Sequence, residues 1–147
     1  MRIGVTCYPT VGGSGVVATE LGLEIARRGH EVHFICYALP YRLGRVPPGV
    51  TFHEVTVPAY PLFQYPPYSL ALASQMADAV RNHSIELLHV HYAIPHAISA
   101  YLAREILGGV PKLVVTLHGT DITVVGADPS FLPIVRVKSV EEGIVEA

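Results

Sequence analysis

Residues 3–29 read IGVTCYPTVGGSGVVATELGLEIARRG, and this stretch decides the fold class. It opens with a short apolar run, passes through a glycine-rich turn, and continues with Val17, Leu21 and Ile25 at four-residue spacing, which is typical of a helix. Gly29 follows two arginines and is expected to end that helix as a left-handed cap. A strand, a turn and a helix in this order predict the first part of a βαβ unit.

The same alternation continues along the chain. Apolar, β-branched runs predict five strands, at residues 3–7, 32–37, 51–57, 87–91 and 113–117. Two more helices are expected, one over about 69–82 and one from Pro95 to the Gly108-Gly109 pair. Residues 38–50 and 58–68 are rich in Pro and Tyr and are expected as loops. The pattern predicts an α/β domain with a Rossmann-like parallel sheet flanked by helices.

Composition restricts the class of protein. Of 147 residues, 50% are hydrophobic and 15% are charged, which suits one domain with one substantial core. A net charge of -2 leaves no excess of Lys and Arg for a nucleic acid, so we expect a small-molecule ligand. The apolar stretches are too short to cross a membrane and the first residues lack a signal-peptide layout, so we expect a soluble, cytoplasmic protein with no membrane partner. Cys7 and Cys36 lie in apolar runs and are expected as buried free thiols.

The glycine-rich turn predicts an anion site. Glycines allow a ligand close to the backbone, and the start of a helix offers unpaired N–H groups to a phosphate or carboxylate. Gly13, Gly15 and Ala18 also satisfy the dinucleotide pattern G-x-G-x-x-A, which leaves NAD as an alternative. Against NAD, the turn is longer than the fingerprint turn and the second strand ends without an acidic residue. A turn that only packs the helix on the strand is the third possibility.

A histidine-rich segment follows the fourth predicted strand. His89 and His91 would share one face, and with His96 or His118 they could bind a metal, as in a metal-dependent hydrolase. The segment has no carboxylate, and a histidine at a strand end is as often a hydrogen-bonded pocket residue. Tyr92, at the tip of this strand, is the better candidate for a pocket wall and hydroxyl donor.

The last predicted strand ends in the polar cluster His118, Gly119, Thr120 and Asp121. Thr120 and Asp121 could merely satisfy local backbone groups, as Asx and Ser/Thr turns do. However, ligands of open α/β sheets bind at the carboxyl ends of the strands. We therefore expect this cluster, Tyr92 and the glycine turn to surround one crevice.

Four motifs together resemble the N-acetylglucosaminyl L-malate synthases of glycosyltransferase family 4. In chain order they are CYPTVGGSG at 7–15, QYPPY at 64–68, HVHYAIPHA at 89–97 and TLHGTDIT at 116–123. The resemblance runs from Ile3 to Arg136. It implies the N-terminal half of a GT-B fold and a retaining transfer of N-acetylglucosamine from UDP-N-acetylglucosamine to L-malate, the first step of bacillithiol biosynthesis. It implies no metal, no cofactor and no protein nucleophile, because the departing phosphate can take the acceptor proton.

The resemblance also implies roles for particular residues. The glycine turn would lie beside the donor phosphates and the acceptor, a role for Gly12, Gly13, Ser14 and Gly15. Tyr92 and Thr116 are expected at the malate carboxylates, and His118 is expected near the donor sugar as the catalytic candidate. The rest of that loop, Gly119, Thr120 and Asp121, is expected to bind substrate.

The chain also departs from the family pattern. The family's second half carries a uracil pocket, a basic diphosphate clamp and a Glu-x7-Glu pair, and no two glutamates here stand eight positions apart. We expect residues 1–136 to form the acceptor-binding domain, residues 137–147 to be an unaligned tail, and the C-terminal donor domain to be absent, which would leave the chain inactive alone. A non-catalytic domain that dimerises or binds a partner is the alternative from another class, beside the metal hydrolase.

Overall fold

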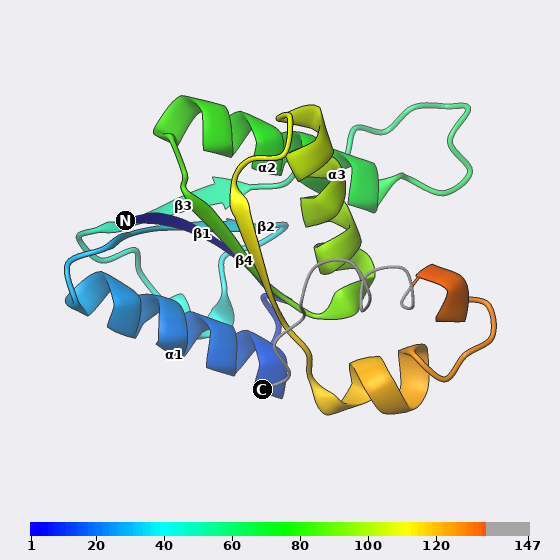
Figure 1. The fold of residues 1–147 in the computed structure, drawn as a ribbon, viewed down its shortest axis with the longest axis horizontal. Coiled ribbons are helices and arrows are strands. Elements are labelled where there is room, and N and C mark those ends of the chain that lie inside the picture. The colour runs from blue at the N-terminus through cyan, green and yellow to red at the C-terminus, as the bar shows by residue number, and fades with distance from the viewer. Residues whose placement is uncertain (135–147) are drawn as a thin grey trace.

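A computed structural model describes residues 1–134, so the tail predicted at 137–147 lies outside the described residues. Figure 1 shows one twisted sheet with helices on both faces. All strands are parallel and lie in the order β3-β2-β1-β4-β5. The strands are β1 (Arg2–Thr6), β2 (Glu31–Cys36), β3 (Val50–Glu54), β4 (Leu87–His91) and β5 (Lys112–Thr116). The predicted Rossmann-like sheet is confirmed, although β3 ends at Glu54 rather than at Val57.

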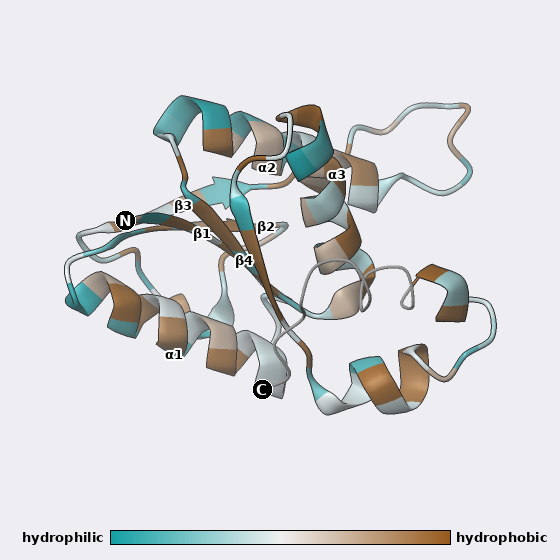
Figure 2. Cartoon of the chain, viewed as in Figure 1, coloured by the Kyte–Doolittle hydropathy of each residue, from teal (hydrophilic) through white to brown (hydrophobic). Residues whose placement is uncertain are grey.

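Helices cover the two faces unequally. The helix α1 (Gly13–Arg27) lies on one face, and α2 (Tyr68–His83) and α3 (Ile98–Ile106) lie together on the other (Figure 1). Each face has its own hydrophobic cluster, one including Phe34 and Ala18 and the other including Leu72 and Met76. Figure 2 shows hydrophobic residues along the central strands, between these helix layers. None of the helices in residues 1–134 is both long and apolar enough to cross a membrane.

The predicted first helix is present, but only Ile25 of its apolar stripe packs against the core, while Val17 and Leu21 do not. Val17 and Leu21 are 50% and 38% exposed. The buried residues of α1 are small, namely Gly15, Ala18, Thr19 and Gly22. A Cβ on Gly22 would lie 2.6 Å from the Phe34 ring, so small side chains bring this helix close to the sheet. Gly29 has φ 86, which confirms the predicted left-handed residue after the helix.

The other two helices agree with the sequence to different degrees. The stripe of α2 formed by Leu72, Met76 and Val80 is buried as predicted. The helix predicted from Pro95 is divided, because a π-type turn, η2 (Ala93–Ala97), precedes α3. Gly108 and Gly109 follow α3 with positive φ, as a helix end requires. Cys7 and Cys36 are buried free thiols, as expected, with their Sγ atoms 4.0 Å apart.

Candidate functional site

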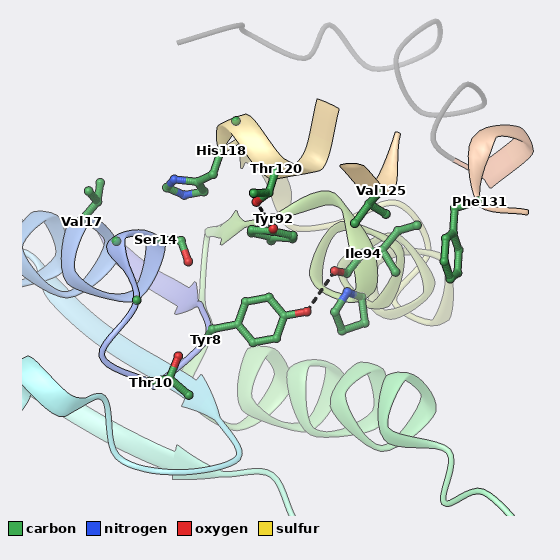
Figure 3. Close-up of a pocket in the computed structure, with 14 residues that line it drawn as sticks. Tyr8, Thr10, Ser14, Val17, Tyr92, Ile94, His118, Thr120, Val125 and Phe131 are labelled. Atoms are coloured by element: carbon green, nitrogen blue, oxygen red, sulfur yellow. Dashed lines mark hydrogen bonds between the residues drawn. The ribbon is translucent and has the colours of Figure 1, made fainter. Parts of the chain in front are cut away.

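The carboxyl ends of β1, β4 and β5 open into one cavity of about 860 Å³. Figure 3 shows the side chains that line it, which come from the β1–α1 turn, the β4–η2 segment and the chain after β5. The lining residues are Tyr8, Thr10, Gly12, Gly13, Ser14, Val17, Tyr92, Ile94, Pro95, His118, Gly119, Thr120, Val125 and Phe131. The predicted convergence of three separate segments is therefore present, at the edge where parallel sheets bind ligands.

The glycine turn presents the start of α1 to this cavity. Gly12 is the N-cap in an extended conformation, and no side chain of the described residues caps the helix. The first N–H groups of a helix have no intrahelical partner and carry a partial positive charge. A Cβ on Gly13 would meet no atom within 4 Å, so this glycine faces open space. The arrangement suits an anion that approaches the helix start from the cavity.

Gly15 has a different role from Gly13. A Cβ there would lie 2.2 Å from the carbonyl oxygen of Tyr8 and 2.9 Å from that of Thr10. Gly15 is buried and does not line the cavity. Its missing side chain allows the turn to fold back over the helix, which places Gly12 and Gly13 at the cavity.

Tyr8 forms part of the cavity wall and is held by several contacts. Its hydroxyl donates to the carbonyl oxygen of Ile94 at 3.2 Å, and its ring meets that of Tyr92 edge to face with centroids 5.2 Å apart (Figure 3). Burial, followed by the charges of Tyr92 and Asp121, raises the pKa of Tyr8. A raised pKa keeps the phenol protonated at neutral pH, so Tyr8 remains a hydrogen-bond donor.

Tyr92 projects from the tip of β4 in an unusual backbone conformation. Its φ of 89 is rare for a residue with a side chain, and such strain tends to occur at functional sites. Its N–H donates to the carbonyl oxygen of Thr116 at 3.0 Å, which fixes the end of β4 against β5. Its hydroxyl forms a hydrogen bond with the Thr120 hydroxyl, so two hydroxyls meet at the cavity (Figure 3).

A row of histidine rings leads from the sheet to the cavity. His89 stacks on His91 with centroids 4.6 Å apart, and His91 stacks on His118 at 5.4 Å. His91 Nδ1 lies 3.1 Å from His118 Nε2. Burial, followed by the charges of the neighbouring histidines, lowers the pKa of His91 to about 3, so its ring is neutral at pH 7.

The tautomer of His118 follows from this row. His91 Nε2 is buried and has no hydrogen-bond partner among the described residues. Because a buried orphan N–H is costly, the tautomer that leaves Nε2 unprotonated is favoured. His91 Nδ1 then donates to His118 Nε2, and a neutral His118 carries its own proton on Nδ1. The hydrogen bond from His91 thus orients the ring of His118, which lines the cavity.

Asp121 lies behind the cavity wall. It is 1% exposed, and its carboxylate accepts the N–H of Ala93 at 2.9 Å and the N–H of His118 at 2.7 Å. Burial raises the pKa of Asp121, while the two backbone hydrogen bonds oppose that rise. The carboxylate therefore joins the chain after β4 to the chain after β5 and holds the backbone of His118 in place.

We expect Asp121→Asn to reduce the free energy of unfolding by about 1–2 kcal/mol, because a neutral amide oxygen replaces a charged acceptor for two backbone donors. Urea unfolding at pH 7.5 measures the change. Asp128→Asn is the matched control, since Asp128 is exposed and its carboxylate accepts hydrogen bonds from nearby Ser130. Equal effects of the two substitutions would contradict the role given to Asp121.

The structure divides the predicted site residues into two groups. Those that line the cavity are Gly12, Gly13, Ser14, Tyr92, His118, Gly119 and Thr120. Those that do not line it are Gly15, Thr116 and Asp121. The Thr116 hydroxyl pairs with His89 Nε2 at 2.8 Å. Gly15 allows the close packing of the glycine turn, Thr116 connects β5 to β4 through His89, and Asp121 holds the loop after β5.

Sequence reasoning did not select several lining residues. Tyr8 and Thr10 lie in the turn that follows β1, and their place after a strand end was the signal that could have identified them. Ile94 and Pro95 reach the cavity because η2 begins at once after Tyr92. Val17, Val125 and Phe131 contribute apolar wall, and no local pattern marks them for that role.

The histidines considered for a metal hydrolase are engaged in other contacts. His89 pairs with Thr116, and His96 Nδ1 lies 2.5 Å from the carbonyl oxygen of His91. Within residues 1–134, these contacts do not bring three of their ligand atoms together as a metal group. The geometry at this cavity suits an anionic small molecule better than a resident metal.

Comparison with known proteins adds three findings. The family model described as Glycosyltransferase Family 4 matches residues 11–140. N-acetyl-alpha-D-glucosaminyl L-malate synthase of Bacillus anthracis is 58% identical over all 147 residues, which span 39% of that protein. A glycosyltransferase from Rickettsia africae ESF-5 superposes with a TM-score of 0.58 at 19% identity, over 78% of this chain and 29% of that chain. The structural likeness supports the fold alone.

Proposed function

This chain belongs to glycosyltransferase family 4, and on that premise we propose that it forms the acceptor-binding half of a GT-B enzyme. The reaction we propose is the retaining transfer of N-acetylglucosamine from UDP-N-acetylglucosamine to the hydroxyl of L-malate, in the cytoplasm, as the first step of bacillithiol biosynthesis. One observation carries this proposal, the 58% identity over all 147 residues with the N-acetyl-alpha-D-glucosaminyl L-malate synthase of Bacillus anthracis. The chain spans 39% of that relative, so the activity of a whole enzyme is part of the proposal.

The cavity has suitable chemistry for a small dicarboxylate. Ser14, Tyr92 and Thr120 supply hydroxyl groups, and the start of α1 supplies backbone N–H groups. Hydrogen bonds from such donors to a carboxylate are among the stronger ones in proteins. Apolar walls from Ile94 and Val125 would exclude water from the carbon chain of the acceptor.

The same cavity is less well equipped for a nucleotide diphosphate. None of its described lining residues is Lys or Arg, whereas phosphoryl groups are usually clamped by such cations. We therefore propose that groups outside the described lining residues hold most of the donor. The 147-residue chain should bind UDP-N-acetylglucosamine weakly and transfer the sugar poorly. Turnover near the rate of an intact family enzyme would contradict this division.

In the proposed reaction the bond between the anomeric carbon and the β-phosphate oxygen breaks, and a bond from that carbon to the malate hydroxyl oxygen forms. The hydroxyl proton passes to the departing phosphate, so no protein base is needed. The positive end of α1 stabilises the charge that develops on the phosphate. His118 donates from Nδ1 toward the donor sugar, in the orientation set by His91.

Malate binding tests the acceptor half directly. In calorimetry with the 147-residue chain, Ser14→Ala and Tyr92→Phe should each weaken L-malate binding about 10-fold or more, because a hydrogen bond to a charged group contributes about 1.5–3 kcal/mol. Tyr41→Phe is the control for loss of a phenol, since Tyr41 is 63% exposed and does not line the cavity. Malate affinity that is equal in all four proteins would refute the proposed acceptor site.

A further inference from the structure

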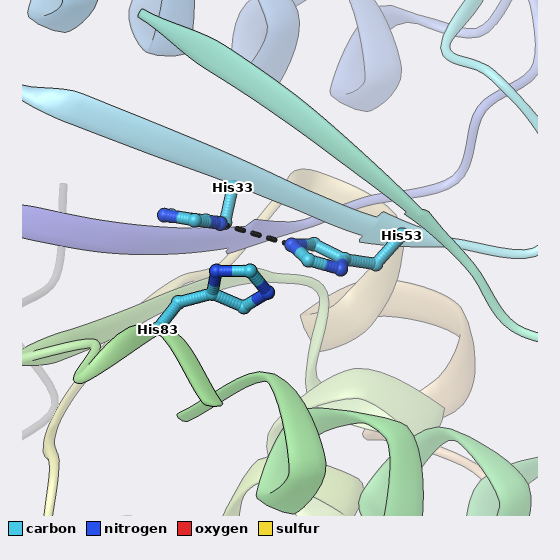
Figure 4. A group of neighbouring side chains, drawn as sticks. All are labelled: His33, His53 and His83. Atoms are coloured by element: carbon cyan, nitrogen blue, oxygen red, sulfur yellow. Dashed lines mark hydrogen bonds between the residues drawn. The ribbon is translucent and has the colours of Figure 1, made fainter. Parts of the chain in front are cut away.

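Three histidines outside the cavity form a second cluster of polar side chains. His33 comes from β2, His53 from β3 and His83 from the last turn of α2 (Figure 4). Ile35 pairs with His53 and lies two residues from His33, so these three side chains are on one face of the sheet. Ile35 belongs to the hydrophobic cluster that includes residues of α2, so this is the face that α2 covers. None of the three lines the candidate active site. No sequence pattern indicates the cluster, since its members come from three separate elements.

The ligand atoms of these rings converge. One nitrogen of each ring lies within 4.8 Å of a nitrogen of the other two, and the ring centroids are 4.8 to 5.2 Å apart. His33 Nδ1 and His53 Nε2 are already 2.9 Å apart. Two nitrogens each about 2.1 Å from a tetrahedral zinc ion stand roughly 3.4 Å apart, so small ring movements would admit an ion.

Glu31 provides a second, independent feature of a metal site. Its Oε1 lies 3.0 Å from His33 Nε2, the nitrogen that points away from the cluster. Histidine ligands of metals usually donate their other N–H to a carboxylate, which fixes the tautomer and strengthens the ligand. With the proton on Nε2, His33 presents the lone pair of Nδ1 to His53 (Figure 4).

The cluster is also electrically suited to a cation. Burial lowers the pKa of His33 and lowers the pKa of His53 to about 4, with the neighbouring histidines adding to the shift of His53. Both rings are therefore neutral at pH 7, the form that coordinates metals. His33 is buried, while His83 reaches solvent, so an ion has a route of entry.

We propose that His33, His53 and His83 form a binding site for one divalent transition-metal ion, with Zn²⁺ as the preferred ion and water in the fourth position. Three imidazoles match the ligand preference of zinc and not that of Mg²⁺ or Ca²⁺, which take oxygen ligands. The ion would replace the hydrogen bond between His33 and His53 and connect β2, β3 and the end of α2. Its place away from the cavity points to a structural role rather than to sugar transfer.

The test uses the tag-free chain, with Zn²⁺ as the titrant in calorimetry and Co²⁺ as a spectroscopic probe. We expect one Zn²⁺ per chain and the visible absorption of four-coordinate Co²⁺ bound to nitrogen ligands. His83→Ala removes a ligand that reaches solvent and should weaken Zn²⁺ binding at least 10-fold. Glu31→Gln keeps all three ligands and should weaken it about 10–100-fold, the usual effect of losing a carboxylate behind a metal ligand.

His30→Ala is the matched control, because it removes one histidine that is outside the cluster and not fully buried. It should leave Zn²⁺ affinity and the Co²⁺ spectrum unchanged. Zn²⁺ should raise the Tm of the unsubstituted chain and not that of His83→Ala, since binding to the folded state alone stabilises it. Equal Zn²⁺ affinity of the unsubstituted chain and His83→Ala, or an octahedral Co²⁺ spectrum, would overturn the proposal.

Discussion

Lowering the pH from 7.5 to about 4.5 should reduce the free energy of unfolding of this chain by up to about 5 kcal/mol. A major cause is a pair of fully buried histidines in the β4–η2 segment, to which His53 adds because its pKa is also lowered to about 4. His91 is 1% exposed and His96 is 0% exposed. Burial is the main cause that lowers the pKa of His91 to about 3 and the pKa of His96 to about 4. In the unfolded chain both rings would titrate near the ordinary value of about 6.5.

The direction of the effect follows from where the protons bind. As pH falls below about 6.5, the unfolded chain takes up protons that the folded chain refuses, so stability present at neutral pH is progressively lost. Each such group costs about 1.4 kcal/mol per pH unit, so two groups between pH 6.5 and 4.5 cost up to about 5 kcal/mol. That loss is comparable with the whole stability of a typical domain, about 5–15 kcal/mol.

Urea unfolding at several pH values between 7.5 and 4.5 measures this effect. His96→Asn keeps a donor for the carbonyl oxygen of His91 and removes one buried titrating ring. As the pH is lowered, its free energy of unfolding should therefore fall less steeply. The difference in slope should correspond to about one fewer proton taken up on unfolding, or about 1.4 kcal/mol per pH unit. His30→Asn, at a histidine that is not fully buried, should keep the original slope. Stability that is constant between pH 7 and 5 would show that these rings are not buried in neutral form.

Gly15→Ala should destabilise the chain by at least about 3 kcal/mol, at the upper end for an added methyl group in a packed interior. The new Cβ would stand 2.2 Å from the carbonyl oxygen of Tyr8. The atoms it meets are backbone atoms of the turn, so no flexible side chain can move aside. The turn and α1 would have to separate, and the candidate anion site would lose its shape.

Gly13→Ala makes the same chemical change two residues away and is the matched control. Its Cβ would meet no atom within 4 Å, and an alanine in the first turn of a helix costs little or slightly stabilises. Thermal and urea unfolding should place Gly13→Ala within about 1 kcal/mol of the unsubstituted chain. Gly13→Ala should nevertheless weaken L-malate binding, because the methyl group would stand in the cavity. Similar unfolding energies for the two alanine variants would contradict the packing role of Gly15.

The order of the secondary structure could be predicted from the sequence because strand and helix periods are local properties. Five β-branched runs became five parallel strands, and the stripe through Leu72 and Met76 became the buried face of α2. The apolar stripe on α1 predicted the helix correctly but not the face that it buries. That helix packs through small residues such as Gly22, which is needed because the Phe34 ring leaves no room for a side chain there. The helical period of the sequence does not reveal such a partner.

The candidate site could likewise be predicted only in part from the sequence. The glycine turn, Tyr92 and His118 were expected at one crevice because carboxyl ends of parallel strands share an edge, and these segments do line one cavity. The motifs did not show which members face the ligand space. Asp121 looked like a polar group for substrate, yet it turns inward to accept the N–H groups of Ala93 and His118.

The sequence by itself determined the parallel α/β class, the glycine-rich helix start and the family resemblance, because each depends on residues that are neighbours in the chain. Only the tertiary structure decided that Gly15 serves packing, that His91 orients His118, and that His33, His53 and His83 meet. Those facts depend on distances between residues far apart in the chain. Such distances are set by how helices and strands pack, and packing is a property of the whole fold rather than of any one segment.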